Sequence, residues 1–238
     1  MATLMLVLGV ALTPLQAYNH GNTLYAQKDY AAAVSAYEAA LEAGTVAAVH
    51  YNLGNALFKT GRIGRAILNY RRARYLDPRD SDIATNLNFA RSYRVDKMLA
   101  VPSPLARVLD DVFHQLSRRG AAVLASVSCM LAALLLASWI VKRWTALAIA
   151  ASLCALVAMF GLITQQVWAS EIAERPAVIV VPEVSALSGP GEEFKQILLL
   201  HDGTELRIRE ARGDYRLVQI PGSGGGWVRK DALERVYR

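Results

Sequence analysis

The longest apolar stretch of the chain runs from position 120 to 170 and contains one charged pair, Lys142-Arg143. A helix needs about 20 apolar residues to cross the hydrocarbon core of a bilayer, so the stretch has room for two spans, 120–141 and 144–168. Two cations at a bilayer centre would cost about 5–7 kcal/mol, so we expect the pair at a turn in headgroups or water. The pattern predicts a two-helix transmembrane hairpin; the alternative is a buried hairpin in a soluble protein.

A shorter apolar run lies at the start of the chain, where residues 1–17 carry no charged side chain. The run at 4–12 is followed by the helix breaker Pro14 and the small residue Ala17. This order resembles a secretory signal peptide and is too short to span a membrane, although the usual basic start is missing. We therefore expect an export signal, either cleaved after Ala17 or retained; the alternative is an apolar first helix of the next domain.

Residues 18–95 contain an internal repeat. The segment YNHGN at 18–22 recurs 33 positions later as YNLGN at 51–55, and the spacing of Leu, Gly, Ala, an aromatic residue and Pro resembles tetratricopeptide (TPR) repeats. Small residues let the two helices of a repeat approach closely, tyrosine fills the space between them, and proline stops the second helix. The positions expected to hold the repeats together are Gly21, Ala33, Tyr37, Ala40, Leu53, Gly54, Ala66, Tyr70, Ala73 and Pro78.

A third segment, 81–94, continues the register of the repeats and starts with capping residues. Such stacks need a solvating terminal helix, so 18–95 is expected to form an all-α TPR solenoid of two repeats and a capping helix. Residues 96–119 would then be a linker to the membrane.

A polar and aromatic stripe repeats on the first helix of each unit at spacings of four and seven residues, and in TPR proteins this face lines the concave groove. An Asn amide can both donate to and accept from an extended peptide; the alternative is that these amides bond neighbouring turns or water. Asn22 and Asn52 match the asparagines of carboxylate-clamp TPRs. Tyr18, Asp82 and Asn86 stand where the clamp cations belong, which favours a peptide body or folded surface as ligand. The candidate partner-binding residues are Tyr18, Asn22, Tyr51, Asn52, Asn55 and Phe58.

Five arginines gather on the second helix of the second repeat. We expect them to form a solvated outer face, near anionic lipid headgroups; the alternative is a dedicated acidic partner. These residues are Arg62, Arg65, Arg71, Arg72 and Arg74.

The remaining chemistry gives little support to catalysis or nucleic-acid binding. The net charge is +5 for 18–119 but −1 for 171–238, so basic residues do not form one concentrated patch. The histidines are scattered, and no HExxH, CxxC, GxSxG or Walker A motif occurs. Cys129 and Cys154 fall inside the expected spans as small apolar side chains and indicate neither a disulfide nor a metal site. We predict no enzyme activity and no cofactor.

The C-terminal region predicts an all-β domain of short strands. Four β-branched or alternating runs, at 177–181, 196–200, 204–208 and 215–220, are separated by turn residues, which favours a compact barrel. The glycine-rich stretch 222–226 is expected to be a flexible hairpin tip. Over 177–236 the motifs LSGP, HDGT, GDY and GWV resemble bacterial SH3 (SH3b) domains. The resemblance implies an SH3-like barrel with a structural or protein-contact role, or one that binds cell-wall peptides.

The order of export signal, TPR repeats, membrane hairpin and SH3b domain resembles the BatE aerotolerance family. The resemblance implies a multidomain protein of the bacterial inner membrane. Its partners would be Bat-type von Willebrand A-domain membrane proteins, a BatD-like protein and a MoxR-type AAA+ ATPase.

We predict a non-enzymatic, membrane-anchored adaptor; the alternative is a cell-wall sensor that binds peptidoglycan through the SH3b domain. Two spans place both soluble domains on one side, and the export signal with the Lys142-Arg143 turn indicates the periplasm. Arg107, Arg118 and Arg119, before the first span, favour the cytoplasm instead.

Overall fold

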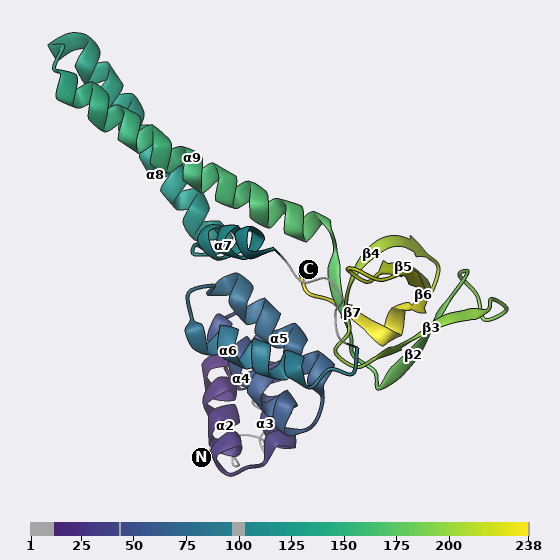
Figure 1. The fold of residues 1–238 in the computed structure, drawn as a ribbon. Coiled ribbons are helices and arrows are strands. Elements are labelled where there is room, and N and C mark those ends of the chain that lie inside the picture. Colours follow the sequence, from purple (N-terminus) through teal and green to yellow (C-terminus); the bar gives the residue numbers. More distant parts are fainter. Residues whose placement is uncertain (1–11, 43, 97–102, 238) are drawn as a thin grey trace. The chain divides into compact units, whose positions relative to one another are not determined.

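The computed structural model describes residues 12–42, 44–96 and 103–237, and Figure 1 shows its helices and strands. The chain forms two compact units: Met1–Val101 with Glu174–Arg238, and Pro102–Ala173. The first unit combines a helical TPR-like region with an antiparallel sheet domain, and the second consists of helices. The apolar run of the expected leader, 4–12, lies outside the described residues except for its last position, 12.

The helices of the TPR region alternate in antiparallel pairs. They are α2 (Pro14–Ala26), α3 (Tyr30–Leu41), α4 (Ala47–Lys59), α5 (Ile63–Leu76) and α6 (Ser81–Ser92). Of the residues expected to hold the repeats together, all are buried except Pro78, which is half-buried. Gly21 and Gly54 lie directly against the rings of Tyr37 and Tyr70, where a Cβ would come within 2.6 and 2.7 Å of a ring carbon.

The first helix starts earlier than the sequence suggested. Thr13 caps α2 in a capping box with Gln16, and Pro14 occupies the first turn, a position where its missing N–H costs nothing. Ala17 is buried in the core. The expected boundary after residue 17 therefore lies inside a helix, and cleavage there would remove the first turn of α2.

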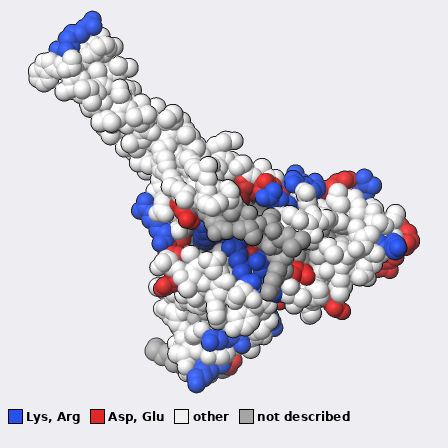
Figure 2. All heavy atoms as spheres, in the orientation of Figure 1, with Lys and Arg blue, Asp and Glu red and all other residues white. Residues whose placement is uncertain are grey.

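The second unit contains α7 (Pro104–Phe113), α8 (Arg118–Lys142) and α9 (Thr145–Ala173). Both α8 and α9 are long and apolar enough to cross a membrane, and Figure 2 shows their surface as almost continuously white, with blue at the far end. Small residues form their contact, since a Cβ on Gly161 would lie 2.9 Å from the Ala121 carbonyl oxygen. Lys142 ends α8, and Arg143 takes the left-handed conformation of the turn (φ 57°). Helix α7 lies within the expected linker and was not predicted.

The sheet domain contains seven strands, joined antiparallel in the order β3-β2-β6-β5-β4-β1-β7. They are β1 (Pro176–Ile179), β2 (Glu183–Leu187), β3 (Gln196–His201), β4 (Glu205–Arg212), β5 (Tyr215–Gln219), β6 (Gly225–Arg229) and β7 (Leu233–Arg235), with a 3-10 turn, η1 (Lys230–Ala232), before β7. Residues from both ends of this order, Leu200 and Leu233, belong to one buried cluster. The sheet therefore curls around a shared core but is open, because β3 and β7 end the order. The expected compact, SH3-like barrel is thus not confirmed.

Three strands, β2, β6 and β7, were not predicted. Strand β6 contains Gly225 and Gly226, which the sequence suggested to be part of a flexible tip. In the structure a Cβ on Gly225 would collide with the Val218 carbonyl, and one on Gly226 would lie 2.9 Å from the Leu187 carbonyl oxygen. Glycine in a strand marks such a close approach of backbones, so the local signal for a turn was misleading here.

Candidate partner-binding site

The asparagines of the first TPR helices are held in hydrogen-bond networks between helices. Asn22 Oδ1 accepts from the Tyr37 hydroxyl at 2.8 Å and from Asn52 Nδ2 at 3.0 Å. Asn52 Nδ2 also donates to the Tyr18 hydroxyl at 3.1 Å. Burial raises the pKa of Tyr37 to about 12, so this phenol keeps its proton and donates at neutral pH. The network thus connects α2, α3 and α4.

A second network repeats this arrangement one repeat later. Asn55 Oδ1 accepts from the Tyr70 hydroxyl at 2.7 Å and from Asn86 Nδ2 at 2.9 Å, and Asn86 Nδ2 donates to the Tyr51 hydroxyl at 3.0 Å. The sequence had identified Asn86 only as a residue that stands where a carboxylate-clamp TPR has a cation. The two networks are equivalent, so the repeat in the sequence is also a repeat of side-chain contacts between helices.

Each network leaves polar atoms available. Asn22 and Asn55 use only Oδ1, and Asn52 and Asn86 use only Nδ2, in bonds among the described residues. Two amide NH2 groups and two carbonyl oxygens therefore remain on half-buried side chains. An extended peptide presents one donor and one acceptor per residue, which this set can match.

A pocket of about 240 Å³ lies on this face, lined by Asn22, Tyr25, Tyr37 and Asn52. Further along, the rings of Phe58, Phe89 and Tyr93 lie with centroids 5.2–5.4 Å apart. Phe89 and Tyr93 are more than half exposed. We call this surface, from the pocket to the aromatic cluster, the groove face.

All six candidate partner-binding residues lie on helices α2 and α4 of the groove face. Sequence reasoning missed the third helix, α6, which contributes Asn86, Phe89 and Tyr93. A signal existed, because Asn86 follows Asn52 by 34 residues, one more than the 33-residue spacing of the first two units. Phe89 and Tyr93 carried no such signal, since α6 lacks a matching partner helix.

Replacing Asn55 by Ala is expected to lower the free energy of unfolding by about 1–3 kcal/mol, because the buried Tyr70 hydroxyl loses its acceptor. The measurement is thermal unfolding of the full chain in detergent. Asn88→Ala, an exposed asparagine on α6, is the control; equal melting temperatures for the two variants would contradict the structural role.

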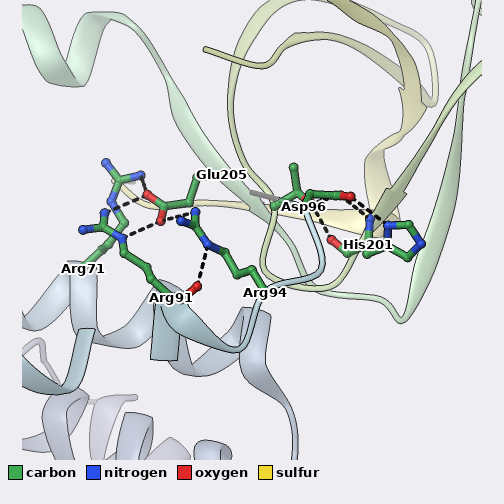
Figure 3. A network of polar contacts seen from close by, with 7 residues as sticks. Arg71, Arg91, Arg94, Asp96, His201 and Glu205 are labelled. Carbon is green, nitrogen blue, oxygen red and sulfur yellow. Dashed lines mark hydrogen bonds and ion pairs between the residues drawn. The ribbon is translucent and has the colours of Figure 1, made fainter. Parts of the chain in front are cut away.

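The opposite side of the TPR region packs against the sheet domain through a buried carboxylate (Figure 3). Glu205, the first residue of β4, is 6% exposed. Arg91 binds it with two hydrogen bonds of 2.7 and 2.9 Å. Arg94 and Arg71 add contacts of 3.1 and 3.3 Å. Three guanidinium groups, from α5, α6 and the segment after α6, thus share one carboxylate of the sheet.

Two aspartates complete this contact. Arg62, the N-cap of α5, provides no side-chain cap; instead Asp202 Oδ2 accepts from the Gly64 N–H at 2.9 Å, as a capping carboxylate does at a helix N-terminus. Asp96 accepts from the His201 N–H and from the Thr204 hydroxyl and bonds His201 Nδ1 at 2.9 Å (Figure 3). The sheet domain therefore caps α5 through Asp202. The segment after α6 binds the sheet domain through Asp96.

The expected solvated face of arginines on α5 is wrong for three of its five members. Arg71 binds Glu205, Arg72 donates to the Arg235 carbonyl at 2.8 Å, and Arg65 lies 2.7 Å from Glu38 and 3.9 Å from Glu234. The acidic partner, considered only as an alternative, is largely the sheet domain of the same chain.

Acid is expected to weaken this interface. Burial alone would raise the pKa of Glu205, but Arg91 and Arg71 outweigh it and lower the pKa from 4.5 to about 2. The pKa of Asp96 is lowered in the same direction by its hydrogen bonds, against the effect of burial. A carboxylate whose pKa is lower in the folded than in the unfolded protein stabilises the fold fully at pH values above its unfolded-state pKa. This stabilisation is lost as the pH falls through the folded-state pKa. The melting temperature should therefore drop between pH 4.5 and 2, and by less in Glu205→Gln; equal acid sensitivity would contradict the assignment.

Within the described ranges, no three His, Cys, Asp or Glu side chains lie close enough together to hold a metal ion. Cys129 and Cys154 are free thiols on α8 and α9.

Comparison with known proteins bears on the TPR region. A search of curated proteins finds no match to the chain. Residues 18–81 match the tetratricopeptide repeat family, whose domains generally serve as non-catalytic scaffolds for other proteins. The helices from α2 to the start of α6 are therefore tetratricopeptide repeats, and protein binding is the function that they suggest.

Proposed function

We propose that the chain is a non-enzymatic, membrane-anchored adaptor that binds a protein partner on the groove face. The observation that carries this proposal is the division of the TPR region into two sides. The side of α5 already binds the sheet domain through Glu205, Asp202 and Asp96. The groove face keeps a pocket, unused amide groups and exposed aromatic rings.

The chemistry of this face favours an uncharged, extended segment with apolar side chains. The pocket and the aromatic cluster are built from Asn, Tyr and Phe. Tyr18 and Asn86, which replace clamp cations, are engaged in the two networks. The partner's backbone would bond the free amides, and an apolar side chain would cover Phe89 and Tyr93.

Phe89→Glu tests this binding mode. Burying a phenylalanine contributes about 1.5–3 kcal/mol, so a charge there should weaken partner capture at least about tenfold. The readout is quantitative mass spectrometry of proteins that copurify with the full chain from membranes. Phe194→Glu is the matched control, because Phe194 is 41% exposed on the sheet domain against 52% for Phe89. Equal losses in both variants, or none in either, would refute the groove as the binding surface.

Anchoring by α8 and α9 is supported by their length, composition and exposed apolar side chains. We place the Lys142-Arg143 turn in the cytoplasm and both domains of the first unit in the periplasm, following an export signal. Alkaline phosphatase fused after Tyr237 should then be active, and fused after Arg143 inactive. The reverse pattern would place the TPR repeats in the cytoplasm.

The order of domains supports a Bat-type complex as the setting: von Willebrand A-domain proteins, a BatD-like protein and a MoxR-type ATPase at the inner membrane, serving oxygen or stress tolerance. The second candidate is a cell-wall sensor, favoured by the SH3b-like motifs of the sheet domain. Incubating the full chain in detergent with purified sacculi separates the two functions. The adaptor predicts that the chain stays in the supernatant, whereas sedimentation with the sacculi would support the sensor.

A further inference from the structure

We propose that α7 is an interfacial helix that lies in the plane of the membrane, with its apolar side in the boundary between lipid headgroups and acyl chains. The inference rests on the proposed anchoring of α8 and α9. It adds a second lipid contact, at the end of the hairpin where α8 begins and α9 ends.

One side of α7 is apolar and uncovered. Leu105, Val108, Leu109 and Val112 follow a spacing of three and four residues, which places them on one helix face. All four are exposed, with Leu105 at 68%. Asp110 and Asp111 lie on the other face and are also exposed. A helix with this division and only ten residues is too short to span a bilayer but suits the interface.

Contacts with α9 hold α7 across the end of the hairpin, as Figure 1 shows. The rings of Phe113 and Phe160 stack with centroids 5.7 Å apart. Trp168 Nε1 donates to the Leu116 carbonyl at 3.0 Å, and its ring meets His114 edge-on at 4.4 Å. Trp168 is only 2% exposed, so its ring packs the junction between α7 and α9. This cluster therefore fixes α7 against α9, next to the start of α8.

Lipid is what covers the apolar side of α7, because α7 adjoins the apolar hairpin. The apolar surface of α8 and α9 is largely exposed and would face lipid, and four residues, His114 to Ser117, separate α7 from α8. Lipid at the same membrane surface thus meets both elements. The exposed pair Arg118 and Arg119 at the start of α8 would meet anionic headgroups there.

Spin-label accessibility in the full chain tests this inference. The chain is placed in nanodiscs of phosphatidylcholine and phosphatidylglycerol after the native cysteines are changed to Ala. Nitroxide is attached to Val108→Cys or Val112→Cys on the apolar side, Asp111→Cys on the polar side, or Met130→Cys within α8. Collision with oxygen reports lipid, and collision with a water-soluble nickel complex reports water.

We expect the ratio of oxygen to nickel accessibility to be severalfold higher at positions 108 and 112 than at 111, and highest at 130. If position 130 is in lipid while 108 and 112 match 111, α7 lies in water and the inference is wrong. Shielding of 108 and 112 from both reagents would mean a protein contact, such as a second copy, and would also overturn it. An aqueous position 130 would refute the anchoring itself.

Discussion

Replacing Glu205 by Ala is expected to destabilise the first unit by about 3–5 kcal/mol, the usual cost of removing one partner from a buried ion pair. The change leaves the guanidinium groups of Arg71, Arg91 and Arg94 facing one another without their shared carboxylate. Because Arg91 and Arg94 belong to α6 and the segment after it, the loss should separate the sheet domain from the TPR repeats. Thermal unfolding of the full chain in detergent measures the effect.

The matched control is Glu210→Ala, in the same strand. Glu210 is exposed and pairs with Arg212 two residues away, and such surface pairs contribute about 0–1 kcal/mol. Hydrogen exchange should also rise in α6 and β4 of the Glu205 variant and stay unchanged in the control. If both variants melt and exchange alike, the buried network does not hold the two domains together.

Replacing Gly54 by Leu is expected to unfold the TPR repeats, whether or not a partner is bound. A Cβ alone would lie 2.7 Å from the Tyr70 ring, and that ring is held by its hydrogen bond to Asn55. Overpacking a core costs about 1–3 kcal/mol or more, and three additional carbons enlarge the clash. Circular dichroism at 222 nm would show the loss of helix.

Ala48→Leu is the control for this variant, because Ala48 is exposed on the same helix, α4. It adds the same side chain without entering the core, so its melting temperature should stay near that of the unchanged protein. A stable, fully helical Gly54→Leu variant would mean that α4 and α5 can separate without loss of the fold, which the close contact with Tyr70 argues against.

Periodic patterns explain what the sequence could predict. The recurrence of Tyr, Asn and Gly 33 positions apart located α2 and α4, because each TPR helix buries the same positions. The two apolar helices followed from length and hydropathy, because a span needs about 20 apolar residues. On the groove face, periodicity identified the stripe of Tyr and Asn on these two helices.

Contacts between distant segments explain what could not be predicted. Arg91 and Glu205 are 114 residues apart, and no local pattern pairs them; only the opposite net charges of the two regions hinted at it. Strand β6 was hidden because glycines at 225 and 226 are needed for close backbone contact and resemble a turn. Helix α7 was missed because it is short and lies beside a far stronger apolar signal.

Photo-crosslinking in cells tests the central claim. The claim is that the groove face binds a protein partner, while the sheet domain packs against the opposite side of the TPR repeats. Benzoylphenylalanine is placed in the full chain at Phe89 of α6 or at Ile197 of β3, which are equally exposed at 52%. The account predicts a discrete adduct from position 89 that disappears when Phe58→Glu is added, and none from position 197. Adducts of equal yield from both positions, or an adduct at 89 that survives Phe58→Glu, would contradict it.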